Sequence, residues 1–341
     1  PVVYFIGKRL SGIAMGLAAA VILASSPFHV FYAQDARMYT LFTFNAAVAM
    51  YALVRLLTDP RAAKPIGSQF RDYLRAWRTP PEPPEPPTAG DFSYRYEPRD
   101  QTGWRAWFSR HRWLPIQAAA TDLAWLAWVV FTAAALYSHN MAILFFLAAN
   151  VFVLGLILFR RIKKSGPSTA LQPPSLGNWL MAQVAILILW SPWIVPFIQQ
   201  AGAVYRRFWI PAPTAESVLK TLASFLNTSA SLLSAISTMV WAVFALVLCA
   251  GLVSYRKKIS QLVFLAALFV IPFFGELIVS IWRPIFTDRT LIWITIPMFL
   301  VLAAGITQLK NRYLMIVMLG ILGTINLFSA SDYFRFYQKE D

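Results

Sequence analysis

The sequence predicts an all-α, polytopic membrane protein that crosses the bilayer about nine times. Of its 341 residues, 58% are hydrophobic and only 13% are charged. The mean hydropathy is +0.56, and several uncharged runs approach the roughly 20 residues that a helix needs to cross a bilayer core. Helix is the expected state of each run, because a segment in lipid must satisfy its own backbone hydrogen bonds. A soluble globular protein is therefore excluded.

Nine apolar segments can be drawn, within a single transmembrane domain over residues 1–341. They are the ranges 12–31, 39–57, 116–137, 141–159, 178–198, 232–253, 259–281, 290–308 and 312–328. The first residues read as the end of an apolar segment followed by Lys8 and Arg9, without the layout of a signal peptide. We therefore expect the natural protein to begin upstream of Pro1, so that an N-terminal part of the domain is missing here.

The basic residues are divided unequally between the two sides of these segments. Twenty-two of the 30 Lys and Arg residues fall on the side of the 58–115 connection, and eight fall on the other side. Because Lys and Arg concentrate on the cytoplasmic side of membrane proteins, we expect a cytoplasmic N-terminus and an extracytoplasmic C-terminus. The net charge of +15 then reflects orientation in the membrane. Nucleic acid is not an expected partner.

Two connections are longer than the others. The cytoplasmic 58–115 connection contains a Pro-rich run at 79–88, which favours extended polyproline II, and an aromatic and basic stretch at 103–115, which is typical of an interfacial amphipathic helix. The extracytoplasmic loop 199–231 has apolar residues at helical spacing, which predict a short helix on the outer surface. These residues are Val218, Leu219, Leu222, Phe225 and Leu226.

Three short connections, at 32–38, 137–140 and 282–289, place ionisable residues together at the predicted outer face. These residues are Asp35, Arg37, His139, Arg283, Asp288 and Arg289. The sequence has no phosphate-binding glycine loop, no nucleophile elbow and no paired metal-binding histidines. A structural explanation of the first connection is that Arg37 snorkels from a span end and forms a surface ion pair with Asp35, worth roughly 0–1 kcal/mol.

One segment of this face resembles a family of membrane enzymes. The sequences Ser26-Pro27-Phe28 and Tyr32-Ala33-Gln34-Asp35-Ala36-Arg37-Met38-Tyr39 are similar to a pattern of GT-C class glycosyltransferases of family 39. This family includes protein O-mannosyltransferases and lipid A aminoarabinose transferases, which use polyprenyl-phosphate sugars. Weaker likenesses occur at Tyr137-Ser138-His139, at Phe208-Trp209-Ile210-Pro211 and in the segment from Arg283 to Arg289. Their order and sidedness agree with the family over almost the whole chain.

The resemblance implies a GT-C-like fold in a bacterial plasma membrane and an inverting sugar transfer at the extracytoplasmic face. The acceptor hydroxyl or phosphate would attack the anomeric carbon, and the polyprenyl phosphate would leave. Because the leaving group is an anion, fixed positive charge should stabilise it. Guanidinium groups bind phosphate bidentately, so Arg37 is the first candidate, Arg289 the second and Arg283 the third. Their alternative role is ordinary snorkelling at span ends.

The remaining candidates keep alternative roles. Asp35, His139 and Asp288 could bind a divalent metal or the acceptor, and Asp35 could equally orient Arg37 and an acceptor hydroxyl. His139 could hydrogen-bond donor or acceptor, or be a satisfied interfacial group. Tyr39 starts a span at the same face. Glu276 lies inside a span, where a carboxyl group is a functional candidate, although pairing with an arginine would explain it equally well.

The family places its catalytic base, an acidic residue, in an outer loop that would precede Pro1. We therefore expect the base to lie outside this chain, and the chain alone to be inactive. Other readings are a polysaccharide ligase, a lipid-linked glycan flippase or transporter, and a noncatalytic membrane subunit. Protein, glycan and lipid acceptors all remain open, as do the sugar, any metal and the oligomeric state.

Overall fold

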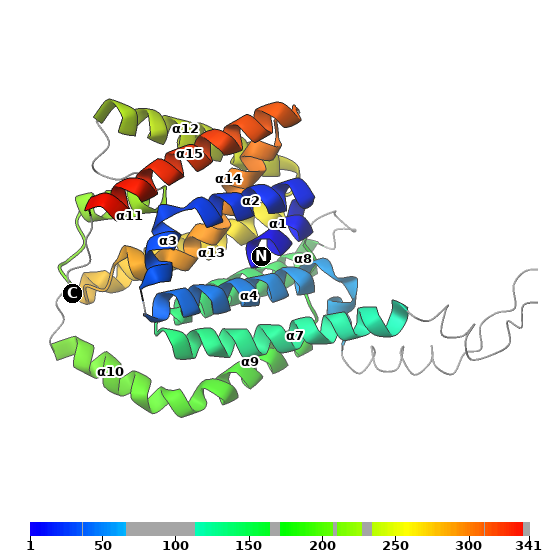
Figure 1. The fold of residues 1–341 in the computed structure, drawn as a ribbon. Helices are drawn as coiled ribbons and strands as arrows, with labels where there is room; N and C mark the ends of the chain where they lie inside the picture. The colour runs from blue at the N-terminus through cyan, green and yellow to red at the C-terminus, as the bar shows by residue number, and fades with distance from the viewer. Residues whose placement is uncertain are drawn as a thin grey trace, which may run out of the picture.

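The computed structural model describes residues 1–35, 37–65, 113–163, 171–206, 210–226, 234–309 and 311–336, and this part of the chain is helical without strands. The helices form one bundle (Figure 1). They are α1 Val2–Ser11, α2 Ile13–Ser25, α3 Pro27–Gln34, α4 Met38–Thr58, η1 Pro60–Ala63, α7 Trp113–Ser138, α8 Ala142–Lys163, α9 Leu176–Trp190, η2 Ser191–Trp193, α10 Ile194–Arg206, α11 Ala215–Phe225, α12 Ser234–Ser254, η3 Tyr255–Lys257, α13 Ile259–Trp282, η4 Asp288–Ile294, α14 Thr295–Thr307 and α15 Arg312–Phe336.

The structure supports a polytopic membrane protein. Within the described ranges, seven helical segments are long and apolar enough to cross a membrane, and an eighth is added if a bent helix pair counts as one span. The sequence predicted about nine. The last predicted span, 312–328, is helical, but its apolar part, Arg312–Leu327, is shorter than the other seven. Which end of the bundle faces the cytoplasm stays a prediction.

The predicted span 12–31 is in fact two helices, α2 and α3, whose axes differ by 57°. The break falls where Ser26 ends α2 and Pro27 starts α3, because proline has no N–H with which to continue the first helix. Proline is favoured at the first position of a helix, and the Ser26 hydroxyl caps α3 by accepting from the His29 N–H at 3.5 Å. The bend carries α3 toward the start of α4.

The N-terminal residues 1–10 were expected to end a span that starts upstream. They form most of helix α1. The chain reverses direction at Gly12, directly after this helix, where φ is 100°. α1 then packs against α2, and the backbones approach closely because Gly7 and Gly16 face one another. A Cβ on Gly7 would lie 2.8 Å from the Gly16 Cα, so glycine is what permits this packing.

The two longer connections are described in part. Residues 66–112 lie outside the described ranges, and with them the Pro-rich run and most of the predicted interfacial helix. The short helix predicted from apolar spacing is present as α11, whereas its position on the outer side of the membrane stays a prediction. A reciprocal capping box starts it: the Thr214 hydroxyl accepts from the Ser217 N–H at 3.1 Å, and the Ser217 hydroxyl accepts from the Thr214 N–H at 2.8 Å.

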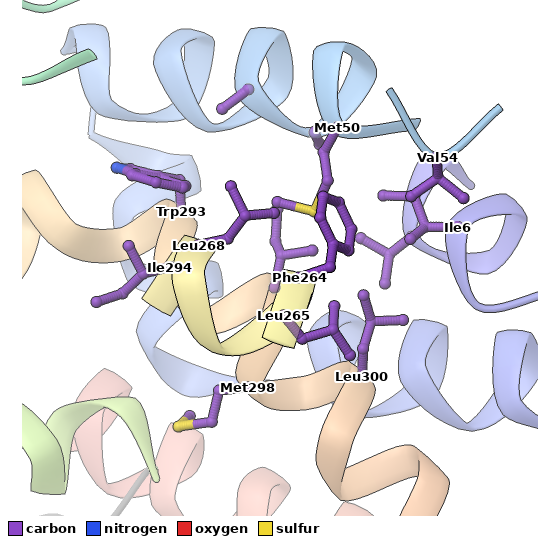
Figure 2. Close-up of a cluster of buried hydrophobic side chains, with 14 of the residues drawn as sticks. Ile6, Met50, Val54, Phe264, Leu265, Leu268, Trp293, Ile294, Met298 and Leu300 are labelled. Atoms are coloured by element: carbon purple, nitrogen blue, oxygen red, sulfur yellow. The ribbon is translucent and has the colours of Figure 1, made fainter. Parts of the chain in front are cut away.

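The core lies where α1, α4, α13 and the η4–α14 segment meet, as Figure 2 shows. Ile6, Phe264, Leu268 and Leu300 are each fully buried there. The same face-to-face packing fixes the ends of the helices. α3, α10 and α11 lie on the left of Figure 1. The α1–α2 turn and the start of α7 lie at the opposite end of the bundle. The turn between α3 and α4 lies at the left-hand end.

Candidate functional site

The three short connections meet at one end of the bundle, as the sequence predicted. The Tyr32 hydroxyl from α3 donates to Asp288 Oδ1 of η4 at 3.4 Å. The Arg289 guanidinium lies over the Tyr39 ring at 5.8 Å, and the Tyr39 and His139 rings are 5.6 Å apart. These contacts link Tyr32, Tyr39, His139, Asp288 and Arg289 into one group. Together with Asp35 and Arg37, which lie between Tyr32 and Tyr39 in the chain, we call this group the rim site.

Asp35 and Arg37 occupy the tight turn between α3 and α4. Arg37 Nε lies 3.4 Å from Asp35 Oδ2, and the two side chains are 57% and 31% exposed. The turn is held by Thr40, whose hydroxyl donates to the Tyr32 carbonyl at 2.7 Å. The ion pair anticipated from the sequence is therefore present, but at this exposure it contributes little to stability. Arg37 keeps enough exposure to reach a ligand at the surface.

Asp288 and Arg289 start η4 and are half-buried. Asp288 Oδ1 accepts the Arg289 backbone N–H at 2.8 Å as well as the Tyr32 hydroxyl. The carboxylate is thereby tied to both connections, and it supplies negative charge beside the Arg289 guanidinium. Because the Tyr39 ring also lies under this guanidinium, Arg289 is held more firmly than Arg37.

His139 lies between α7 and α8 and is neutral at physiological pH. Its Nδ1 accepts the Met141 N–H at 3.0 Å, and its ring stacks on Phe42 at 5.6 Å. Burial, aided by the positive charge of Arg289, lowers the pKa of His139 to about 4. Since Nδ1 is an acceptor in the neutral ring, Nε2 carries the hydrogen and can donate to a ligand.

Glu276 and Arg283 are placed by α13. Glu276 is fully buried, and its Oε2 accepts the Thr290 hydroxyl at 2.7 Å. The alternative explanation was that Glu276 pairs with an arginine. Among the described residues, Glu276 forms no ion pair, and its partner is Thr290. Arg283 ends α13, where its N–H donates to the Val279 carbonyl at 2.9 Å. Arg283 is half-buried.

Sequence reasoning missed two members of this region. Tyr32 was quoted within the motif, but nothing in the sequence indicated that its hydroxyl would reach Asp288. His29 was not singled out, and its Nε2 lies 2.7 Å from the Thr295 hydroxyl at the start of α14. The available signal was the spacing: Tyr32 follows His29 by three residues, so both lie on one face of α3.

An apolar groove of about 370 Å³ lies beside the rim site, between α11, α12, α13 and α14. Its lining consists of apolar side chains, including Leu222, Trp241, Ala266, Phe269 and Met298. α11 separates the groove from the rim site, because Leu222 lines the groove whereas Phe225 contacts the Phe28 ring at 5.5 Å. Phe28 in turn contacts the Tyr32 ring at 5.1 Å.

The described residues contain no group of three or more His, Cys, Asp or Glu side chains placed to hold a metal ion. The metal option for Asp35 and Asp288 stays a proposal, as does the phosphate-binding role of the arginines. The family-like Phe208 and Trp209 lie outside the described ranges. Comparison with known proteins adds no relative: no family model, curated protein or solved structure matches this chain.

Proposed function

We propose that this chain belongs to a membrane glycosyltransferase that takes a sugar from a polyprenyl-phosphate donor. One observation carries the proposal: the rim site, with two arginines, lies one short helix away from a wholly apolar groove. A polyprenyl-phosphate sugar has a long apolar tail and an anionic head, and this arrangement has room for each. The resemblance of residues 26–39 to family 39 supports the same substrate class.

In this mechanism the arginines stabilise the leaving phosphate. The acceptor oxygen bonds to the anomeric carbon while the bond from that carbon to the phosphate oxygen breaks, and the electron pair leaves with the polyprenyl phosphate. Arg289, held over Tyr39 and beside Asp288, would bind the phosphate in a fixed position. Arg37, whose side chain is more exposed, would supply a second guanidinium to the phosphate.

His139 and the aspartates would then act on the sugar or the acceptor. Neutral His139 can donate from Nε2 to a hydroxyl without adding charge. Asp35 would orient Arg37 or bind a divalent cation, and Asp288 orients the turn that carries Arg289. The proton of the acceptor would go to a general base, for which the resemblance implies an acidic residue.

The test is transfer of a radiolabelled sugar from polyprenyl-phosphate donors to a membrane extract, catalysed by the protein encoded by the complete open reading frame in proteoliposomes. We expect label in the acceptor fraction and release of polyprenyl phosphate. Movement of intact donor between leaflets without cleavage would instead favour the transporter reading. Neither cleavage nor movement would favour a noncatalytic subunit.

A further inference from the structure

The segment between α13 and η4 carries Arg283, Asp288 and Arg289, yet it is not itself a regular helix over 284–287. Its shape therefore depends on contacts with neighbouring elements, and two buried polar side chains of α13 form such contacts. Glu276 and Ser280 are four residues apart, so they lie on one face of the helix, and they are 0% and 3% exposed.

Ser280 folds the beginning of the segment back on α13. Its Oγ accepts the Ile285 N–H at 3.1 Å and the Phe286 N–H at 3.0 Å. Phe286 is buried and contacts the Phe273 ring at 5.6 Å. These contacts satisfy two backbone donors and place the chain against α13, but they end two residues before Asp288.

Glu276 holds the other end. Its Oε2 accepts the Thr290 hydroxyl, which also lies 2.8 Å from the Thr287 carbonyl. The Thr287 hydroxyl lies 3.2 Å from that of Thr290, and the Thr287 backbone lies beside the Glu276 carboxyl group. Oε1 of Glu276 has no hydrogen-bond partner of good geometry among the described residues. The carboxyl group thus contacts the two threonines that flank Asp288 and Arg289.

A buried carboxyl group is a costly way to fix a loop, because an unpaired carboxylate loses several kcal/mol of hydration inside a helix bundle. In this structure the Glu276 carboxyl group contacts the Thr287–Thr290 turn. Within that turn, Asp288 contacts Tyr32 and Arg289 lies over Tyr39. Without this anchor, the contacts with α13 described above would be those of Ser280 and Phe286, which end before Asp288.

We infer that Glu276 is a positioning residue, which acts through Thr290 to place Asp288 and Arg289 in the rim site. The inference rests on the proposed function only in naming the ligand of Arg289, the donor phosphate. Glu276 does not touch this ligand. Its contribution is the hydrogen bond to Thr290, so an amide oxygen at position 276 can replace a carboxyl oxygen.

The experiment compares Thr290→Val, Thr290→Ser, Glu276→Gln and Glu276→Ala in the complete chain. The control is Thr132→Val, the same substitution at a fully buried residue of α7 whose hydroxyl has no partner among the described residues. The first readout, hydrogen–deuterium exchange of the 283–290 peptide in nanodiscs, does not depend on catalysis. The second is the KM and kcat for a polyprenyl-phosphate sugar.

We expect Thr290→Val and Glu276→Ala to speed exchange at 283–290 and to raise the donor KM by roughly 2- to 13-fold, the effect of one net hydrogen bond. Thr290→Ser and Glu276→Gln should remain close to the wild type, as should Thr132→Val. Unchanged exchange in Thr290→Val would overturn the inference. So would equal losses in Glu276→Gln and Glu276→Ala, because the charge would then be what matters.

The two proposals fail in different ways. A wild-type protein that neither binds nor cleaves the donor would contradict the proposed function, while the exchange data would still report whether Glu276 fixes the turn. Normal donor turnover with unchanged exchange in Thr290→Val would contradict the positioning role alone.

Discussion

The Tyr32 hydroxyl donates to Asp288 Oδ1 at 3.4 Å, although 256 positions separate the two residues in the chain. This contact joins the bend after α2 to the turn before η4. Asp288 also accepts the Arg289 N–H, so the orientation of α3 and that of Arg289 are coupled. The residues that would bind a donor phosphate therefore depend on contacts between elements rather than on one local motif.

Replacing Arg37 tests the residue for which the sequence argument is strongest. Arg37→Ala removes an exposed guanidinium, so we expect normal expression and membrane insertion. A charge-assisted hydrogen bond contributes about 1.5–3 kcal/mol, so sugar transfer should fall by roughly 10- to 150-fold or to background. Turnover is measured at saturating donor.

The matched control for Arg37→Ala is Lys220→Ala. Lys220 is 73% exposed on α11 and pairs with Glu216, so its loss removes a positive charge from the same end of the bundle without touching the rim site. The assignment of Arg37 would be wrong if its alanine variant retained wild-type turnover.

His139 predicts a specific dependence of stability on pH. Its pKa is about 4 in the folded protein and 6.5 in the unfolded chain. As pH falls from 6.5 toward 4, the unfolded chain takes up a proton that the folded protein does not, so the free energy of unfolding decreases. The loss is at most about 3.5 kcal/mol, because one pKa unit corresponds to about 1.4 kcal/mol.

Thermal unfolding between pH 4 and pH 8 measures this effect, with His139→Asn for comparison. Asparagine does not titrate, so the variant should lose less stability than the wild type on acidification. Among the described residues, the charged and aromatic groups that face His139 are Arg289, Tyr39 and Phe42. Identical pH profiles for the two proteins would contradict a buried, neutral His139.

The apolar groove predicts a dependence on the donor's chain length. Ala266 lines the groove, and Ala266→Phe would fill part of its volume. We expect a higher KM for long polyprenyl donors and little change for a short-chain analogue, measured in the same transfer assay. Val263→Phe is the control, because Val263 lies on the same helix and is 50% exposed outside the groove. Equal effects of both variants would exclude the groove as a tail site.

Close packing of α12 on α14 makes a prediction about stability that is independent of function. A Cβ on Gly305 would collide with the Val247 carbonyl oxygen, so Gly305→Ala must push the helices apart. Overpacking of this kind costs about 1–3 kcal/mol. Gly320→Ala on α15 meets no atom within 4 Å and should be neutral or stabilising. Thermal melting in detergent compares the two, and equal melting temperatures would contradict this packing.

The sequence predicted the helical class, most spans and the meeting of three connections, because hydrophobic length and loop position are local properties. The bend at Ser26 and Pro27 was within reach of the sequence, since a serine cap before proline marks a helix start. Residues 12–31 were nevertheless predicted as one span, because their hydrophobicity is continuous across Ser26 and Pro27.

Other parts of the site could not be predicted. The partner of Glu276 is Thr290, fourteen residues along the chain, and an arginine was equally reasonable until the fold of the 283–290 segment was known. The contact of Tyr32 with Asp288 depends on how α3 packs against η4. Such pairings follow from tertiary packing, for which a single sequence carries no direct signal.

The most direct test of the central claim is binding of polyprenyl phosphate, compared with the uncharged polyprenol, to the complete chain in nanodiscs. We predict that the phosphate binds at least about 10-fold more tightly than the alcohol, and that Arg289→Ala removes this preference whereas Lys220→Ala preserves it. Equal affinity for phosphate and alcohol in the wild-type protein would contradict a phosphate-binding rim site, and with it the proposed glycosyltransferase.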